Sequence, residues 1–156
     1  NPKDGQFYGC GMSAWATNQM IQVGGLYRIR YTGQPLHLPL AMRAQASGVQ
    51  LSFASPLDPS TTEKLDAFEI NTWDLKRSRK YGSKRYNSQT LAIDQISLSK
   101  DGKNLMIHLP DIQPTWVLEI KYDLQAADGT SFQGAIQGTI HVLGPDAPIS
   151  SGRLTD

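Results

Sequence analysis

The chain lacks the features that define several protein classes. It contains one cysteine, Cys10, so an internal disulfide is excluded. It contains no run of about twenty apolar residues, so no membrane-spanning helix is expected. Its formal net charge is only +1, which gives no overall field that would favour nucleic acid or a membrane surface as a partner. The phosphate-binding, dinucleotide-binding and serine-hydrolase motifs are also absent.

Few residues are suited to reactive thiol or metal chemistry. Cys10 stands between two glycines, far in sequence from any histidine, and nothing nearby would lower its pKa. We therefore expect a small buried packing residue, with a reactive thiol as the alternative. His37, His108 and His141 lie in or beside predicted strands, where partly exposed histidines are common. The sequence thus indicates no metal site and no cofactor.

The dominant pattern is alternation of apolar and polar residues, which is typical of strands with one buried face. It recurs over about seven segments separated by turn residues such as Ser47-Gly48, Asp101-Gly102 and Asp128-Gly129. This spacing predicts an all-β fold, an antiparallel immunoglobulin-like two-sheet β-sandwich. The residues expected in its core are Leu51, Phe53, Phe68, Ile70, Leu105, Ile107, Trp116, Leu118, Ile120 and Tyr122.

The length of 156 residues fits one domain with an extension. We expect an N-terminal strand extension over 1–33, the sandwich over 34–144, and a linker or tail over 145–156. The sequence Ser60-Thr61-Thr62-Glu63 has the form of a capping box and predicts one short helix that ends near Ala67. Residues 76–90 are predicted to be an irregular polar loop.

Two long segments carry a resemblance to known families. The segments LSFASPLDPSTTEKLDAFEINTW and LSKDGKNLMIHLPDIQPTWVLEIKYDLQAADGTSF resemble bacterial immunoglobulin-like domains of the S-layer type. Residues 24–143 as a whole resemble the C-terminal module of large secreted bacterial proteins. Those proteins carry a glucose/sorbosone-dehydrogenase-like β-propeller, often with a c-type haem domain. The motifs are the GGLYRIRYTG strand and the set Trp73, Tyr81, Gly82 and Ser83.

The resemblance implies that the chain belongs to a larger secreted protein, periplasmic or extracellular. Residues 1–33 would be a remnant of the last propeller blade, and the parent propeller or neighbouring domains would be the partners. The haem-attachment motif C-x-x-C-H is absent, so the oxidoreductase chemistry of the family does not transfer to this chain.

Many of the basic residues are concentrated in one segment. Six of its 15 basic residues lie between Lys76 and Arg85, and the remaining sequence has nine basic and 14 acidic residues. Cations interleaved with aromatic rings suit phosphates, sulfates or uronates. The candidate ligand-binding residues are Trp73, Arg79, Lys80, Tyr81, Lys84, Arg85 and Tyr86. The alternative is a solvated loop that docks on an acidic neighbouring domain.

The sequence predicts different degrees of burial for the three tryptophans. Trp116 opens an alternating strand and is expected in the core, whereas Trp73 borders the polar loop and is the better surface candidate. Trp15 is expected to be exposed only if its parent blade is missing.

Three functions remain open from the sequence. The first is a non-catalytic immunoglobulin-like accessory domain. The second is a carbohydrate-binding module for an anionic, plant or microbial polysaccharide. The third is a hydrolase that uses two of the carboxylates Asp58, Glu63, Asp66, Glu69 and Asp74.

Overall fold

The computed structural model describes residues 3–12 and 24–149, and the chain divides into two compact units, residues 1–35 and 36–156. The second unit is a β-sandwich. One of its sheets has the order β3 (Pro39–Gln45), β4 (Gly48–Phe53), β8 (Asn104–His108), β7 (Gln95–Leu98). The other has the order β10 (Ser131–Ile140), β9 (Thr115–Gln125), β5 (Phe68–Asp74), β6 (Tyr86–Thr90).

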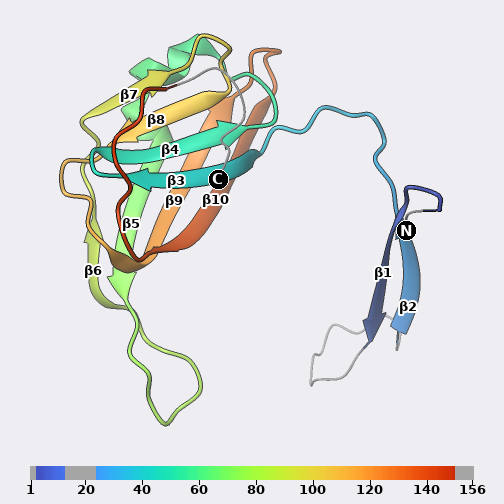
Figure 1. The fold of residues 1–156 in the computed structure, drawn as a ribbon, viewed down its shortest axis with the longest axis horizontal. Helices are drawn as coiled ribbons and strands as arrows, with labels where there is room; N and C mark the ends of the chain where they lie inside the picture. Colours follow the sequence, from blue (N-terminus) through green and yellow to red (C-terminus); the bar gives the residue numbers. More distant parts are fainter. Residues whose placement is uncertain (1–2, 13–23, 150–156) are drawn as a thin grey trace. The chain divides into compact units, whose positions relative to one another are not determined.

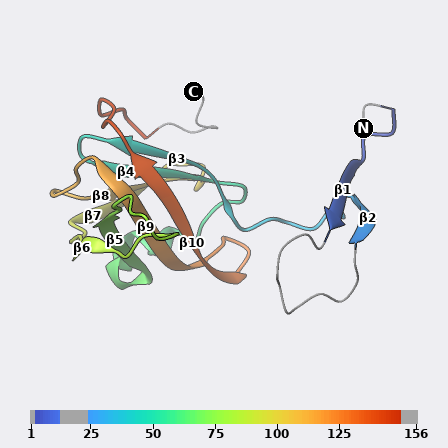
Figure 2. The ribbon, with the colours of Figure 1, turned by 90° about the horizontal axis from the view of Figure 1, so that it is seen from below.

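All neighbouring strands in both sheets are antiparallel. The strands of one sheet cross those of the other (Figures 1 and 2). In chain order, this arrangement corresponds to strands A, B, E and D facing strands G, F, C and C′ of the immunoglobulin fold. The predicted all-β immunoglobulin-like sandwich is therefore confirmed.

The core lies between the two sheets, where alternate residues of the facing strands meet. Nine of the ten predicted core residues are buried. Phe53, Tyr122 and Phe132 pack edge to face, with ring centroids 5.9–6.4 Å apart. The exception is Trp116, whose exposed fraction is 57%, so its prediction as a core residue is wrong.

A two-residue turn joins β3 to β4. Gln45 pairs with Gly48, so Ala46 and Ser47 form the turn and Gly48 is the first residue of β4. Gly48 has φ +150°, and a Cβ atom there would overlap the carbonyl oxygen of Ile107 on β8. The close approach of β4 to β8 thus requires glycine at this position.

The predicted short helix is present as two short 3₁₀-helices, η1 (Pro59–Glu63) and η2 (Leu65–Ala67), and it starts before the predicted capping box, which does not cap it. The N-cap is Asp58, whose Oδ1 accepts a hydrogen bond of 2.8 Å from the Ser60 backbone N–H. Pro59 at the first position favours this start because its missing N–H has no partner to lose.

The predicted irregular loop over 76–90 is wrong in its last third. Residues Tyr86–Thr90 form the edge strand β6, which pairs with β5. All five of its residues are exposed, so it lacks the apolar alternation that marks a strand in a sequence.

The segment after β10 is bonded to the β3–β4 turn. Asp146 Oδ1 accepts hydrogen bonds from the Ser47 backbone N–H (2.9 Å) and hydroxyl (2.7 Å). The Ala147 N–H donates to Oε1 of Gln45, which is buried. These bonds fix residues 144–147 against the turn.

The bonds from Ser47 hold the pKa of Asp146 below its ordinary value of 3.8. Because the pKa of Asp146 is lower in the folded than in the unfolded state, its carboxylate stabilises the fold. This contribution is complete when the pH is above the unfolded pKa, and it is lost as the pH falls from about 4 through the folded pKa. We expect Asp146→Asn to be destabilising at neutral pH, and its difference from the wild type to shrink in acid. Urea unfolding at several pH values measures this. Asp111→Asn is the control, and an Asp146→Asn effect that is equal at every pH would contradict the account.

The first unit contains a two-stranded antiparallel sheet, β1 (Phe7–Met12) paired with β2 (Gly24–Ile29). Much of its apolar surface is exposed, including 68% of Phe7 and 76% of Leu26. Cys10 is also exposed, so its prediction as a buried packing residue is wrong. A sheet of two strands has no second layer of its own to cover either face.

Candidate functional site

The candidate site is the basic loop, Lys76–Arg85, which connects β5 to β6 and projects beyond the end of β5 (Figure 1). Serine hydroxyls shape it. Ser83 Oγ accepts a hydrogen bond of 3.0 Å from the Lys76 N–H and donates one of 2.8 Å to the Lys84 carbonyl, so it ties the two sides of the loop together. Ser78 Oγ donates to the Lys80 carbonyl at 3.1 Å. Gly82 turns the chain with φ +82°.

Two of the cations in the basic loop rest on aromatic rings. The Arg85 guanidinium carbon lies 3.9 Å from the centroid of the Trp73 ring, and Lys76 Nζ lies 4.6 Å from that of Tyr86. Both distances fall within the range of cation–π attraction. Trp73 and Tyr86 therefore anchor the two ends of the loop.

Trp73 is only 6% exposed, so its prediction as a surface platform is wrong. Trp73 lies two and four residues after Asn71 and Glu69 in β5, so its side chain is on the same face of the sheet as theirs, the outer face. Arg85 then covers it there. A side chain on an outer face is buried only when another segment of the chain folds over it, and the sequence around Trp73 gives no sign of such a segment.

Trp116 is the exposed tryptophan of the described residues. The three residues of β10 from Gly138 to Ile140 lie opposite the four residues of β9 from Thr115 to Leu118, so β9 has one extra residue there. This irregularity interrupts the alternation just before Leu118 and releases Trp116 from the core. Its backbone stays fixed, because the Thr139 hydroxyl donates a hydrogen bond of 2.8 Å to the Trp116 carbonyl.

The basic loop and Trp116 border an open hollow of about 710 Å³. Its lining residues are Leu75, Lys76, Arg77, Ser78, Arg79, Lys80, Tyr81, Gly82, Ser83 and Trp116. Tyr81 is fully exposed. Of the predicted site residues, Arg79, Lys80 and Tyr81 line this hollow, and Trp116 is the member that sequence reasoning missed.

A second hollow of about 270 Å³ shares Trp116 with the first. It is lined by Asp74, Pro114, Thr115, Trp116, Thr139, Ile140 and His141. Its polar groups are hydroxyls, an imidazole and one carboxylate, and the Asp74 carboxylate accepts a hydrogen bond of 2.8 Å from the Asn87 amide. Trp116 thus borders one basic and one hydroxyl-rich hollow.

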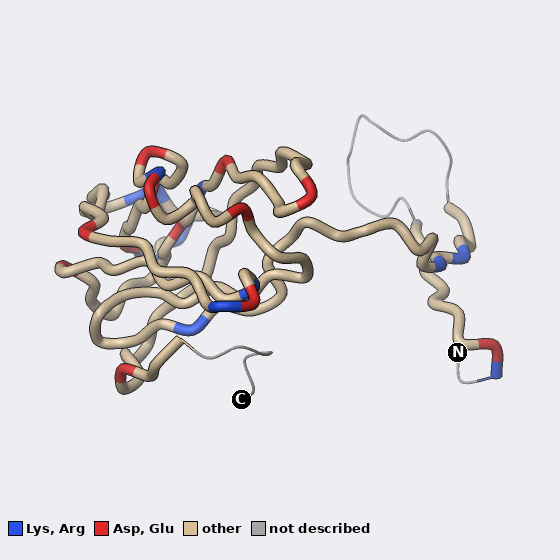
Figure 3. The backbone as a smooth tube through the Cα atoms, turned by 90° about the horizontal axis from the view of Figure 1, so that it is seen from above, with Lys and Arg blue, Asp and Glu red and all other residues tan. Residues whose placement is uncertain are grey.

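The acidic residues are distributed along the chain, and one of them, Asp74, ends β5 just before the basic loop. On the face viewed in Figure 3, Asp and Glu occur at separate turns of the backbone. The ion pairs found in the described part of the chain involve Lys121 and His37, not the basic loop.

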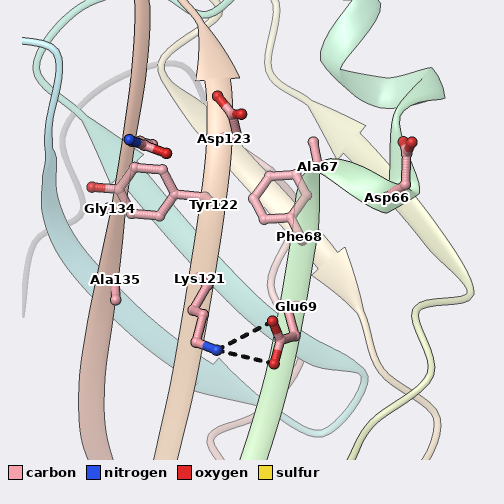
Figure 4. A pocket seen from close by; sticks show the side chains of 10 residues that line it. Asp66, Ala67, Phe68, Glu69, Lys121, Tyr122, Asp123, Gly134 and Ala135 are labelled. Atoms are coloured by element: carbon pink, nitrogen blue, oxygen red, sulfur yellow. Dashed lines mark hydrogen bonds and ion pairs between the residues drawn. The ribbon is translucent and has the colours of Figure 1, made fainter.

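A third hollow, of about 370 Å³, lies over β5, β9 and β10 and contains Asp66, Glu69 and Asp123. Figure 4 shows the Glu69 carboxylate turned toward Lys121, while the other two carboxylates lie at the opposite end. Lys121 Nζ is 3.1 Å from Glu69 Oε1. Hydrogen bonds from Asn71 and Lys121 lower the pKa of Glu69, the opposite of what a general acid needs.

The other candidate residues do not assemble into a site. His37 Nε2 lies 3.4 Å from Asp128 and His108 Nε2 lies 3.4 Å from the Ser97 hydroxyl. Over residues 3–12 and 24–149, no group of three potential metal ligands occurs. No helix in those residues is long and apolar enough to cross a membrane. Trp15 lies outside the described residues.

No family model, no curated protein and no solved structure matches this chain.

Proposed function

We propose that this chain is a non-catalytic immunoglobulin-like interaction domain of a larger secreted protein, and that its β1–β2 hairpin docks on a neighbouring domain. The observation that supports this proposal is the contrast between the two units. The sandwich buries a continuous apolar core, whereas the hairpin leaves Phe7, Leu26 and Ile29 more than half exposed. Apolar surface of this kind gains stability when a protein surface covers it.

The geometry of the hairpin also supports a proposal for the kind of partner. Within the described residues, β1 and β2 pair only with each other, so each has an open edge that another strand can join. Phe7, Tyr27 and Ile29 share one face by their register. Burying such a side chain contributes about 1.5–3 kcal/mol. The fitting partner is a β-sheet domain with an apolar rim, and the propeller of the family that the sequence resembles is the expected one.

Without its partner, the hairpin should cause weak self-association. We expect the chain to form dimers or larger species as its concentration rises, and Phe7→Ser with Leu26→Ser to restore the monomer. Sedimentation velocity measures the mass. Leu65→Ser with Val142→Ser, which changes two exposed apolar residues of the sandwich, is the matched control and should leave the association unchanged.

Hydrogen exchange tests the docking itself. The amides of β1 and β2 should exchange much faster in the isolated chain than in the full-length protein, while those of β4 and β8 should be protected in both. A chain that stays monomeric at every concentration, with hairpin amides already protected, would contradict the proposal.

A further inference from the structure

We propose that the basic loop and Trp116 form a binding site for an acidic polysaccharide, a chain of sugars in which some residues carry a carboxylate or sulfate. This site goes beyond the docking role of the hairpin and uses different residues. The inference rests on three observations: unpaired cations, exposed aromatic rings, and a neighbouring hollow of different polarity.

The cations of the basic loop are crowded and uncompensated. Arg77, Arg79, Lys80 and Lys84 are exposed, and none of them takes part in an ion pair within the described part of the chain. Like charges held this close repel one another. An anionic ligand relieves that repulsion and releases its own counterions, so both effects favour binding.

The loop is partly organised before any ligand arrives. Lys76 on Tyr86 and Arg85 on Trp73 hold its ends, and the Ser83 hydroxyl bridges its two sides. Less conformational freedom is then lost on binding, which strengthens the complex. It also means that the ligand meets the four remaining cations, not the two that the rings already hold.

The exposed rings supply a surface for a sugar. Trp116 is 57% exposed in the wall of the loop hollow, and Tyr81 stands free in the loop. The C–H face of a pyranose is apolar and packs on such rings while its hydroxyls remain hydrogen-bonded. An acidic sugar can therefore pack on the Trp116 indole ring while its carboxylate or sulfate points toward the cations of the basic loop.

The second hollow distinguishes a polysaccharide from a nucleic acid. Trp116 also borders Thr115, Thr139, His141 and the Asp74 carboxylate. Hydroxyl, imidazole and carboxylate groups are suitable partners for the hydroxyls of a neutral sugar. A nucleic acid carries a phosphate on every residue, so its next phosphate would meet the negative Asp74.

The binding test uses the whole chain and four probes in isothermal titration calorimetry: a partly methyl-esterified hexagalacturonate, a dextran oligomer sulfated on some of its residues, cellohexaose and an oligodeoxythymidylate. We expect one or both acidic sugars to bind more tightly than the other two, and the stronger one identifies the acid group. Affinity should fall steeply between about 50 and 200 mM salt. Equal or tighter binding of the oligodeoxythymidylate or cellohexaose, or no binding of either acidic sugar, would overturn the proposal.

Variants locate the site. Arg79→Ser with Lys80→Ser should weaken binding of the acidic sugar at least about tenfold and reduce the salt slope by about two. Lys64→Ser with Lys100→Ser removes the same charge from other exposed positions and should have little effect. Trp116→Ala should cost about tenfold, with Trp116→Phe recovering part of it. A loop variant that binds no more weakly than its control would also overturn the proposal. The hairpin variant Phe7→Ser with Leu26→Ser should bind normally, which separates this site from the docking function.

Discussion

Replacing Gly48 with alanine is expected to lower the free energy of unfolding of the sandwich by about 3–5 kcal/mol, a loss well above that of an ordinary substitution. Gly48 begins β4 opposite His108, and a methyl group there would overlap the Ile107 carbonyl on β8. The backbone of a paired central strand cannot move aside without breaking ladder hydrogen bonds. The φ of +150° adds a conformational cost, because it is unfavourable for a residue with a Cβ atom.

Gly129→Ala separates these two causes. Gly129 also has a positive φ, +87°, but a Cβ atom there would meet no atom within 4 Å. This variant should therefore cost only about 1 kcal/mol, since it pays for conformation alone. Urea unfolding followed by circular dichroism measures both. If the two variants lose equal stability, β4 and β8 do not approach as closely as described.

The second large effect is expected at Trp73. Trp73→Ala should lower the free energy of unfolding by about 3 kcal/mol, because it removes a buried ring and leaves a cavity on the outer face of β5. It also removes the surface on which Arg85 rests, so the end of the basic loop should loosen. Trp116→Ala should cost less than about 1 kcal/mol, because more than half of that side chain is exposed.

The comparison is sharp because both variants remove the same side chain. Denaturation gives the two free energies, and the fluorescence of each variant reports which tryptophan is in water. The remaining fluorescence should be red-shifted in Trp73→Ala relative to Trp116→Ala. A larger loss of stability in Trp116→Ala would show that the register of β9 and β10 is not as described.

Much of the sandwich could be predicted from local sequence. In the centre of β9, Leu118, Ile120 and Tyr122 alternate with polar residues, and all three are buried as expected. The Asp128-Gly129 pair does lie between β9 and β10. These predictions succeed because burial of one strand face and the conformation of a turn are both local properties.

The two tryptophans show where local reasoning fails. The alternation that correctly placed Leu118 also placed Trp116 inside, and the irregular pairing with β10 that releases it depends on residues beyond 138. The burial of Trp73 depends on Arg85, which returns over it after the whole basic loop. Both outcomes are set by the partner segment, so a pattern within one strand contains no signal for them.

The candidate site was predicted in part for the same reason. Crowding of Arg79, Lys80 and Lys84 is visible in the sequence, whereas the approach of Trp116 to the loop depends on the pairing of β5 with β9. The basic loop and Trp116 are thus far apart in sequence, so the sequence does not show that they belong to one site. The Pro114-Thr115 pair before Trp116 was the available hint that the strand had barely begun there.

The most direct test of the account is a nuclear magnetic resonance titration of the chain with the tighter-binding acidic oligosaccharide. The account predicts that the indole N–H of Trp116 and the backbone amides of the basic loop shift together, with a smaller change at the covered indole of Trp73. The amides of β1 and β2 should not respond. Shifts confined to the hairpin, or spread over the acidic turns with Trp116 unaffected, would contradict the assignment of the basic loop and Trp116 as a binding site.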